Sequence, residues 1–295
     1  MVFRSIFETA RRPVISFELF PPKTEAGERA LERHVERLLT FQPGFMTCTY
    51  GAGGSTQQKT LDIVTRIKQR WNVPVASHLT CVGADRTRLR DYLSAAAAQH
   101  IDAIVALRGD PPRGSATFQP VAGGLSHANE LVELIRAEYP QFGVAVAGYP
   151  EKHIEAPSWE SDLSFLKRKV DAGADIVITQ LFYDNDDFFR FRDRCHAIGI
   201  AVPIVPGLLP IASFSQVQRI TSLCGASLPD DLVGRLQQAG SDAEQAAIGT
   251  EHATAQAESL IAAGVPGIHF YVLNRSEAAA QILEVLDLSS SNEPT

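Results

Sequence analysis

The fold of this chain is decided by the stretch Ile15-Ser16-Phe17-Glu18-Leu19-Phe20-Pro21-Pro22. Its apolar residues predict a short strand over 14–20, which two prolines end because proline cannot continue a hydrogen-bonded ladder. Glu18 lies inside this strand, where a charge is costly unless it is paired, neutral or facing a polar cavity. Because burial raises the pKa of a carboxyl group, we expect Glu18 to be a proton donor near neutral pH. A salt-bridged glutamate at a strand end is the structural alternative.

Composition and charge narrow the class of protein. The 295 residues are 45% hydrophobic and 21% charged, which is typical of a globular chain with enough apolar material for a core. The net charge of −7 argues against nucleic-acid binding, which needs a basic face. Four separated cysteines without a CxxC pair predict reduced thiols, and no metal-binding motif is present. The sequence has neither a secretory signal nor an apolar run long enough for a membrane span, so we expect a cytoplasmic protein.

Short apolar strands and amphipathic helices alternate along the chain. After the first strand, further strands are expected at 45–50, 73–79, 101–107, 143–148, 174–180, 202–208 and 267–273. Helices are expected at 26–39, 57–69, 86–98, 128–138, 159–172, 187–198, 213–263 and 277–286. Pro229 and Gly240 are expected to divide the long region 213–263.

Eight such units predict a closed parallel barrel, the (βα)8 or TIM barrel, built as a single domain over 13–288. The strands are nearly continuous apolar runs, as expected when both faces are buried. Residues 1–12 would form an N-terminal extension and 289–295 a disordered tail. A doubly wound sheet is the structural alternative.

The barrel prediction specifies where chemistry should occur, because functional residues of this fold lie at the C-terminal ends of the strands. Seven of the eight predicted strands end on groups that hydrogen-bond or ionise: Glu18, Thr49-Tyr50, His78-Leu79-Thr80, Arg108-Gly109-Asp110, Tyr149 to His153, Gln180 and Asn274-Arg275. The glycine-rich turn 51–55 matches no phosphate-binding fingerprint and is interpreted as a tight turn. His78 and His153 are the histidines best placed for a site.

Several of these motifs occur together, and in this order, in the 5,10-methylenetetrahydrofolate reductase family. They are Phe17-Glu18-Leu19-Phe20-Pro21-Pro22, Thr49-Tyr50-Gly51-Ala52, His78-Leu79-Thr80-Cys81, Ala106-Leu107-Arg108-Gly109-Asp110, Tyr149-Pro150-Glu151, 167–174, 178–180 and Leu273-Asn274-Arg275. The chain therefore resembles bacterial members of this family from about residue 13 to 286. The resemblance implies a barrel that binds FAD non-covalently and reduces 5,10-methylenetetrahydrofolate to 5-methyltetrahydrofolate. NADH or NADPH would supply the electrons, in ping-pong through the flavin.

The resemblance also implies a role for individual residues. Glu18 would be the general acid that protonates N10 of the folate, and Asp110 would tune the flavin and help bind the folate. Gln180 would contact the pterin, and Arg275 would help hold the substrate. The implied flavin-binding residues are Thr49, His78, Leu107, Arg108, Gly109, Asp110, Tyr149, His153, Asp162, Arg168, Lys169 and Ala174.

Some positions depart from the family pattern. Phe165 stands in place of a polar flavin contact, so one hydrogen bond is expected to be missing. Ile220 stands in place of an aromatic stacking partner. The loop 111–126, which contains Arg113 and Phe118, is expected to be longer than usual and to reshape the adenosine side or the mouth of the site.

Other expectations concern partners and competing functions. The resemblance implies a homo-oligomer, no membrane and no nucleic-acid partner, and we do not expect a C-terminal regulatory domain that binds S-adenosylmethionine. The sequence has no Rossmann motif with an acidic residue that would bind the ribose of NADH and exclude NADPH. Either nicotinamide could therefore be the electron donor. A competing hypothesis is a flavin- or folate-binding barrel that needs a partner subunit or another electron donor. A barrel aldolase or isomerase is disfavoured because no Schiff-base lysine ends a strand.

Overall fold

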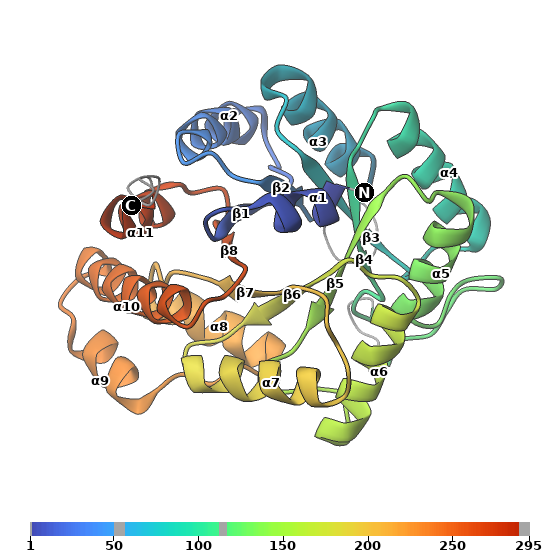
Figure 1. Cartoon of the computed structure of the whole chain (residues 1–295). Helices are drawn as coiled ribbons and strands as arrows, with labels where there is room; N and C mark the ends of the chain where they lie inside the picture. The colour runs from blue at the N-terminus through green and yellow to red at the C-terminus, as the bar shows by residue number, and fades with distance from the viewer. Residues whose placement is uncertain (1, 50–56, 112–116, 289–295) are drawn as a thin grey trace.

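The computed structural model describes residues 2–49, 57–111 and 117–288, and Figure 1 shows a barrel of strands inside a ring of helices. The strands pair in parallel in chain order, and β1 also pairs with β8, which closes the barrel. Their bounds are β1 Val14–Leu19, β2 Phe45–Cys48, β3 Val75–Thr80, β4 Ala103–Leu107, β5 Gly143–Gly148, β6 Ile176–Leu181, β7 Ile204–Leu208 and β8 Gly267–Tyr271. The predicted single-domain (βα)8 barrel is confirmed, and the doubly wound alternative is excluded.

The helices begin where the sequence supplies capping side chains. Thr24, Asp85 and Ser158, for example, each accept a hydrogen bond from a backbone N–H of the first turn. The helices are α1 Val2–Thr9, α2 Glu25–Leu39, α3 Gln57–Trp71, α4 Arg86–Ala98, α5 Ala128–Glu138, α6 Trp159–Asp171, α7 Asn185–Ala197, α8 Phe214–Cys224, α9 Asp230–Gln238, α10 Asp242–Ala262 and α11 Glu277–Leu286. The predicted long region 213–263 is divided as expected, with Pro229 before α9 and Gly240 before α10. Within the described ranges, no helix is both long and apolar enough to cross a bilayer.

Four strands begin two residues later than their apolar patterns predicted. The aspartates just before two of them are used instead as caps for neighbouring strands. Asp102 accepts the N–H of Val75 at 2.9 Å, and Asp175 accepts the N–H of Val144 at 2.8 Å. These two aspartate side chains therefore add hydrogen bonds between neighbouring strands beyond those of the backbone ladders.

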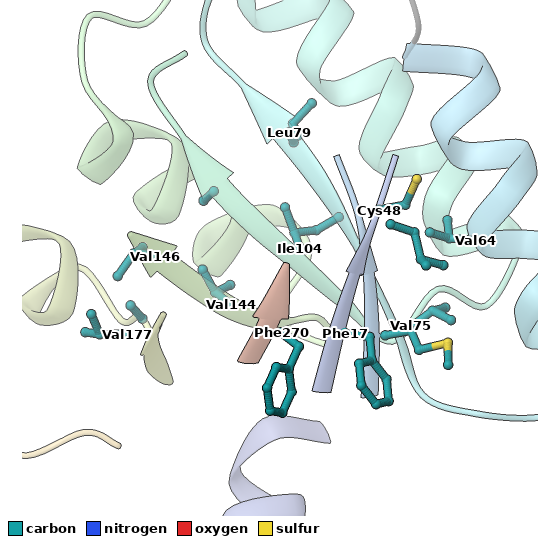
Figure 2. Packing of buried hydrophobic residues seen from close by; sticks show 14 of the residues in the cluster. Phe17, Cys48, Val64, Val75, Leu79, Ile104, Val144, Val146, Val177 and Phe270 are labelled. Carbon is teal, nitrogen blue, oxygen red and sulfur yellow. The ribbon is translucent and has the colours of Figure 1, made fainter. Parts of the chain in front are cut away.

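Most of the hydrophobic core lies between the strands and the helices. Phe17 of β1 and Phe270 of β8 are fully buried there, with ring centroids 6.1 Å apart. Figure 2 shows these rings with Val75, Ile104 and other strand residues in the same cluster. Since successive strand residues point to opposite faces, their neighbours Ser16, Glu18 and His269 are directed into the barrel.

The N-terminal extension forms a helix, α1, that packs on the N-terminal end of the barrel within the ring of outer helices (Figure 1). Phe3 of α1 is fully buried, and its ring centroid lies 4.9 Å from that of Phe45. A Cβ at Gly143 would lie 2.9 Å from the Phe3 ring, so β5 carries glycine where this ring enters. The N-terminal end of the barrel, called the bottom below, is thus closed by aromatic packing.

Candidate active site

Two neighbouring strands direct polar side chains to the same region inside the barrel. Ser16 of β1 aligns with His269 of β8, and Glu18 aligns with Tyr271. Residues two apart on a strand share a face, so all four side chains point into the barrel, Ser16 and His269 from the middle of their strands and Glu18 and Tyr271 from nearer the C-terminal ends. The apolar neighbours of Glu18 face the helices instead.

Glu18 lies between two imidazole rings. Its Oε2 atom is 3.2 Å from Nε2 of His78 and 3.6 Å from Nε2 of His269. His269 is fully buried, and its Nδ1 atom lies 2.8 Å from the hydroxyl of Ser16. Nδ1 of His78 is buried and has no hydrogen-bond partner in the part of the chain that the structure describes. Glu18, His78 and His269 are called the carboxylate–imidazole group below.

The structure corrects the expected ionisation of Glu18. Burial raises the pKa of its carboxyl group, but the nearby imidazoles of His78 and His269 outweigh burial and lower the pKa from 4.5 to about 2. The predicted raised pKa is therefore wrong for this structure. The prediction relied on the apolar neighbours in the sequence, whereas the side chains in contact with Glu18 come from β3 and β8. At neutral pH the carboxyl group of Glu18 is therefore ionised.

A second cluster brings together four predicted flavin-binding residues. The rings of Tyr149 and His153 meet edge to face at 4.6 Å, and the backbone N–H of His153 donates to Asp162 at 3.2 Å. The ammonium of Lys169 lies 6.0 Å from the Tyr149 ring centroid and donates to the Ala147 carbonyl at 2.5 Å. Burial lowers the pKa of Lys169 to about 8 and raises the pKa of Asp162. This cluster offers a cation and hydrogen-bonding rings to an anionic ligand.

Arg108 extends from the end of β4 beside that cluster. Its Nε donates to the Gly109 carbonyl at 3.1 Å, and its two terminal nitrogens donate to the carboxylate of Glu155 at 2.6 and 3.0 Å. The guanidinium carbon lies 5.2 Å from the centroid of Phe118, in the loop predicted to reshape the site. Gly109 has a φ of +86°, and a Cβ there would lie 2.7 Å from Val82, so this turn requires glycine.

A side-chain amide fixes the end of β1. The side chain of Asn274 accepts the N–H of Phe20 at 2.8 Å and donates to the carbonyl of Phe20 at 2.7 Å. Leu273 and Asn274 both have positive φ angles, which asparagine tolerates better than most residues. This pair of hydrogen bonds holds the loop after β8 against the residue that follows Glu18 and Leu19.

The predicted substrate-binding residues also lie at the C-terminal ends of the barrel strands, which are called the rim below. Asp110 and Arg275 are exposed, and Gln180 is half-buried, with its Oε1 accepting the N–H of Leu181 at 2.9 Å. Thr49 and Leu107 are also half-buried, at the ends of β2 and β4. The turn 51–55 and Arg113 lie outside the described residues.

Two further predicted flavin-binding residues, Arg168 and Ala174, do not follow the C-terminal end of a strand. Arg168 is exposed in an open groove between α5 and α6, and its guanidinium carbon lies 5.2 Å from the Phe165 ring centroid. Phe165 in turn stacks on His127, with ring centroids 5.8 Å apart. Ala174 precedes β6 and is buried at the opposite, N-terminal end of the barrel. Its backbone N–H donates to the carbonyl of Lys169 at 3.2 Å.

Sequence reasoning missed His269, Ser16 and Tyr271. Tyr271 is half-buried, and its hydroxyl donates to the Thr179 carbonyl at 2.7 Å. Burial raises the pKa of Tyr271 well above 10. The signal was present, because the strand Gly267–Tyr271 alternates and so puts His269 and Tyr271 on one face.

The structure places these ionisable groups toward the C-terminal ends of the barrel strands, which is where enzymes of this fold carry their active sites. A model of the family described as methylenetetrahydrofolate reductase matches residues 3–287. The chain belongs to this family. It is 38% identical over 288 residues to the 5,10-methylenetetrahydrofolate reductase of Escherichia coli, covering 96% of this chain and 94% of the relative.

Longer relatives also match. The chain is 41% identical over 288 residues to a probable methylenetetrahydrofolate reductase (NADH) of Oryza sativa, covering 94% of this chain and 48% of the rice protein. It thus spans about half the length of the plant relatives it matches. The solved structure of an uncharacterized Clostridium thermocellum protein that binds two copies of 5-methyl-5,6,7,8-tetrahydrofolic acid has a TM-score of 0.65 at 15% identity, covering 97% of this chain and 99% of that chain. At that identity, the likeness shows the fold alone.

Proposed function

We propose that this protein reduces 5,10-methylenetetrahydrofolate to 5-methyltetrahydrofolate, with FAD bound non-covalently and NADH or NADPH as the electron donor. The observation that carries the proposal is Glu18, held 3.2 and 3.6 Å from two imidazoles at the active rim of a barrel of this family. Reduction of the methylene carbon breaks its bond to N10 and requires a hydride at that carbon and a proton at N10. The carboxylate–imidazole group is the part of the described site best suited to supply that proton.

The residues beside the carboxylate–imidazole group fit FAD. Arg108 and Lys169 provide cations for its diphosphate, and the buried Nδ1 of His78 and Oγ1 of Thr47 are without hydrogen-bond partners among the described residues. Tyr149 and His153 would bind its polar edges. When bound, FAD would supply the redox chemistry that amino-acid side chains lack, accepting electrons from the nicotinamide and delivering them to the folate.

Glu18 would act as the general acid toward N10 of the folate, with its proton drawn from the imidazoles. In the uncovered site the carboxylate is ionised beside His78 and His269. A ligand that covers the site removes water, which raises the cost of separate charges and favours transfer of a proton from an imidazole nitrogen to Oε2 of Glu18. The neutral acid then donates to N10. Ser16 keeps the His269 ring oriented through its 2.8 Å contact with Nδ1.

Three rim residues would hold the substrate. Gln180 can turn its amide toward the pterin, Asp110 can accept from a ring N–H, and the exposed Arg275 can pair with the folate carboxylates. Asn274 beside Arg275 is tied to β1, so substrate contacts there are mechanically coupled to the strand that carries Glu18.

An anaerobic titration tests the proposal. The purified protein should show a flavin spectrum, one nicotinamide should bleach it, and 5,10-methylenetetrahydrofolate should restore the colour. A flavin that neither NADH nor NADPH bleaches would instead favour a barrel that depends on a partner subunit or another electron donor. Light scattering on the same sample tests the proposed homo-oligomer.

A further inference from the structure

We propose that Glu155 is a built-in counter-ion that occupies the anion-binding edge of Arg108 and is displaced by the diphosphate of a dinucleotide. The inference rests on the proposed function, in which Arg108 helps to bind FAD. It assigns to Glu155 a role in setting the affinity for the cofactor, separate from the reaction itself.

A guanidinium can bind an anion through two parallel hydrogen bonds along either of two edges. In Arg108 both of these edges are already occupied. A guanidinium has five N–H donors, and anions bind it best through two parallel hydrogen bonds. Both terminal nitrogens of Arg108 donate to Glu155, at 2.6 and 3.0 Å, and Nε donates to the Gly109 carbonyl at 3.1 Å. The edge between the terminal nitrogens holds a carboxylate, and the edge that includes Nε holds a peptide oxygen. A phosphate that binds in the bidentate mode must therefore replace Glu155.

Glu155 can leave this position without disturbing its surroundings. Its side chain is 44% exposed, whereas that of Arg108 is 24% exposed, so the carboxylate can turn into water. Its backbone stays anchored because its N–H donates to Nδ1 of His153 at 3.1 Å. Arg108 stays in place because its guanidinium lies on Phe118 at 5.2 Å. The ion pair therefore occupies the end of the guanidinium until a more highly charged ligand displaces Glu155.

The chain offers a matched control pair away from the rim. Arg90 of α4 donates to both carboxylate oxygens of Glu138 at the end of α5, each at 2.7 Å. The exposed fractions of these side chains are 44% and 37%, close to that of Glu155. Glu138→Gln thus removes the same kind of ion pair from a helix–helix contact, where no cofactor contact is proposed.

The test measures FAD binding by the apoprotein through quenching of flavin fluorescence. Glu155→Gln should lower the Kd for FAD by about twofold to fivefold, since exposed ion pairs are weak competitors. The Kd for riboflavin, which has no phosphate, should not change, and Glu138→Gln should leave both constants at their wild-type values. An unchanged or higher Kd for FAD in Glu155→Gln would overturn the inference, and a higher value would mean that Glu155 positions Arg108 for binding.

A double substitution separates competition for Arg108 from general charge repulsion. In an Arg108→Gln background, Glu155→Gln should no longer tighten FAD binding, because the edge for which the carboxylate competes is gone. An equal gain in both backgrounds would show repulsion alone and would overturn the inference. If the wild-type apoprotein binds no FAD, the proposed function fails; if it binds FAD and Glu155→Gln has no effect, only the role of Glu155 fails.

Discussion

The two ends of the barrel have different interiors, although the same eight strands form both. At the N-terminal end, α1 presses Phe3 against Phe45, and the interior consists of apolar side chains. At the C-terminal end, the interior holds Glu18 between two imidazoles and leaves Nδ1 of His78 without a hydrogen-bond partner in the described ranges. One end is packed for stability, and the other keeps polar atoms available for ligands.

The difference has an energetic consequence. A buried polar atom without a partner costs about 1–3 kcal/mol, so Nδ1 of His78, which has no partner among the described residues, weakens the fold. Fully burying a large apolar side chain stabilises a fold by about 1.5–3 kcal/mol, and the bottom contributes this for both Phe3 and Phe45. Substitutions at the two ends should therefore separate stability from activity.

The largest effect is expected at Glu18. Glu18→Gln keeps the size of the side chain but removes the acid, so folate reduction should fall by about 10²–10⁴-fold. Bleaching of the flavin by the nicotinamide should persist, because it does not need this proton. Stopped-flow measurement of the two half-reactions checks the prediction. Loss of both half-reactions would mean that Glu18 has a different role.

The matching change at the bottom is Phe3→Ala. Removing this buried ring should lower the free energy of unfolding by about 3–5 kcal/mol, as measured by urea denaturation. The KM for the folate and the Kd for FAD should stay at wild-type values at temperatures where the variant is folded. A variant of wild-type stability would show that α1 contributes little to the closure of the barrel.

The stability of the fold should depend on pH through Glu18, which lies toward the C-terminal end of the barrel. Glu18 has a pKa of about 2 in the folded chain against 4.5 as its ordinary value. Its ionised form therefore stabilises the fold above pH 4.5, and that contribution, on the order of 3 kcal/mol, is lost as pH falls toward 2. The stability of wild type relative to Glu18→Gln should decrease over this interval in urea titrations. A difference that does not vary with pH would contradict the lowered pKa.

A smaller effect is expected at Asp110. This residue is exposed, so Asp110→Asn should change the free energy of unfolding by less than about 0.5 kcal/mol. Loss of one charged contact with the substrate should lower folate turnover by about tenfold. Steady-state kinetics and thermal melts on the same preparation check both parts. Wild-type folate kinetics would remove Asp110 from the proposed site.

The sequence predicted the barrel well because its apolar periodicity is strong and local. The strand Gly143–Gly148 and the helices Arg86–Ala98, Ala128–Glu138 and Glu277–Leu286 lie where the pattern placed them. The strand starts that came late depend on Asp102 and Asp175, which cap neighbouring strands, and such pairing is not visible along one chain. Helix α1 was not foreseen because its eight residues are too few to define a periodic pattern.

The sequence indicates which strand ends carry the candidate site residues, but it does not indicate the electrostatics around them. The positions of Glu18, His78 and Arg108 follow from the strand ends, which the sequence locates. The pKa of Glu18 depends first on His78 of β3, at 3.2 Å, and then on His269 of β8, which only closure of the barrel brings within 3.6 Å. The pairing of Arg108 with Glu155 likewise joins residues that the sequence does not connect.

The most direct test of the account is the ionisation of Glu18 itself. A carbon-13 NMR titration of the side-chain carboxyl, assigned by comparison with Glu18→Gln, would follow its protonation between pH 7 and pH 4. We predict that Glu18 stays ionised throughout this range, because His78 and His269 hold its pKa near 2. A midpoint above 4.5 would contradict it and would return Glu18 to the role of a neutral acid in an apolar strand.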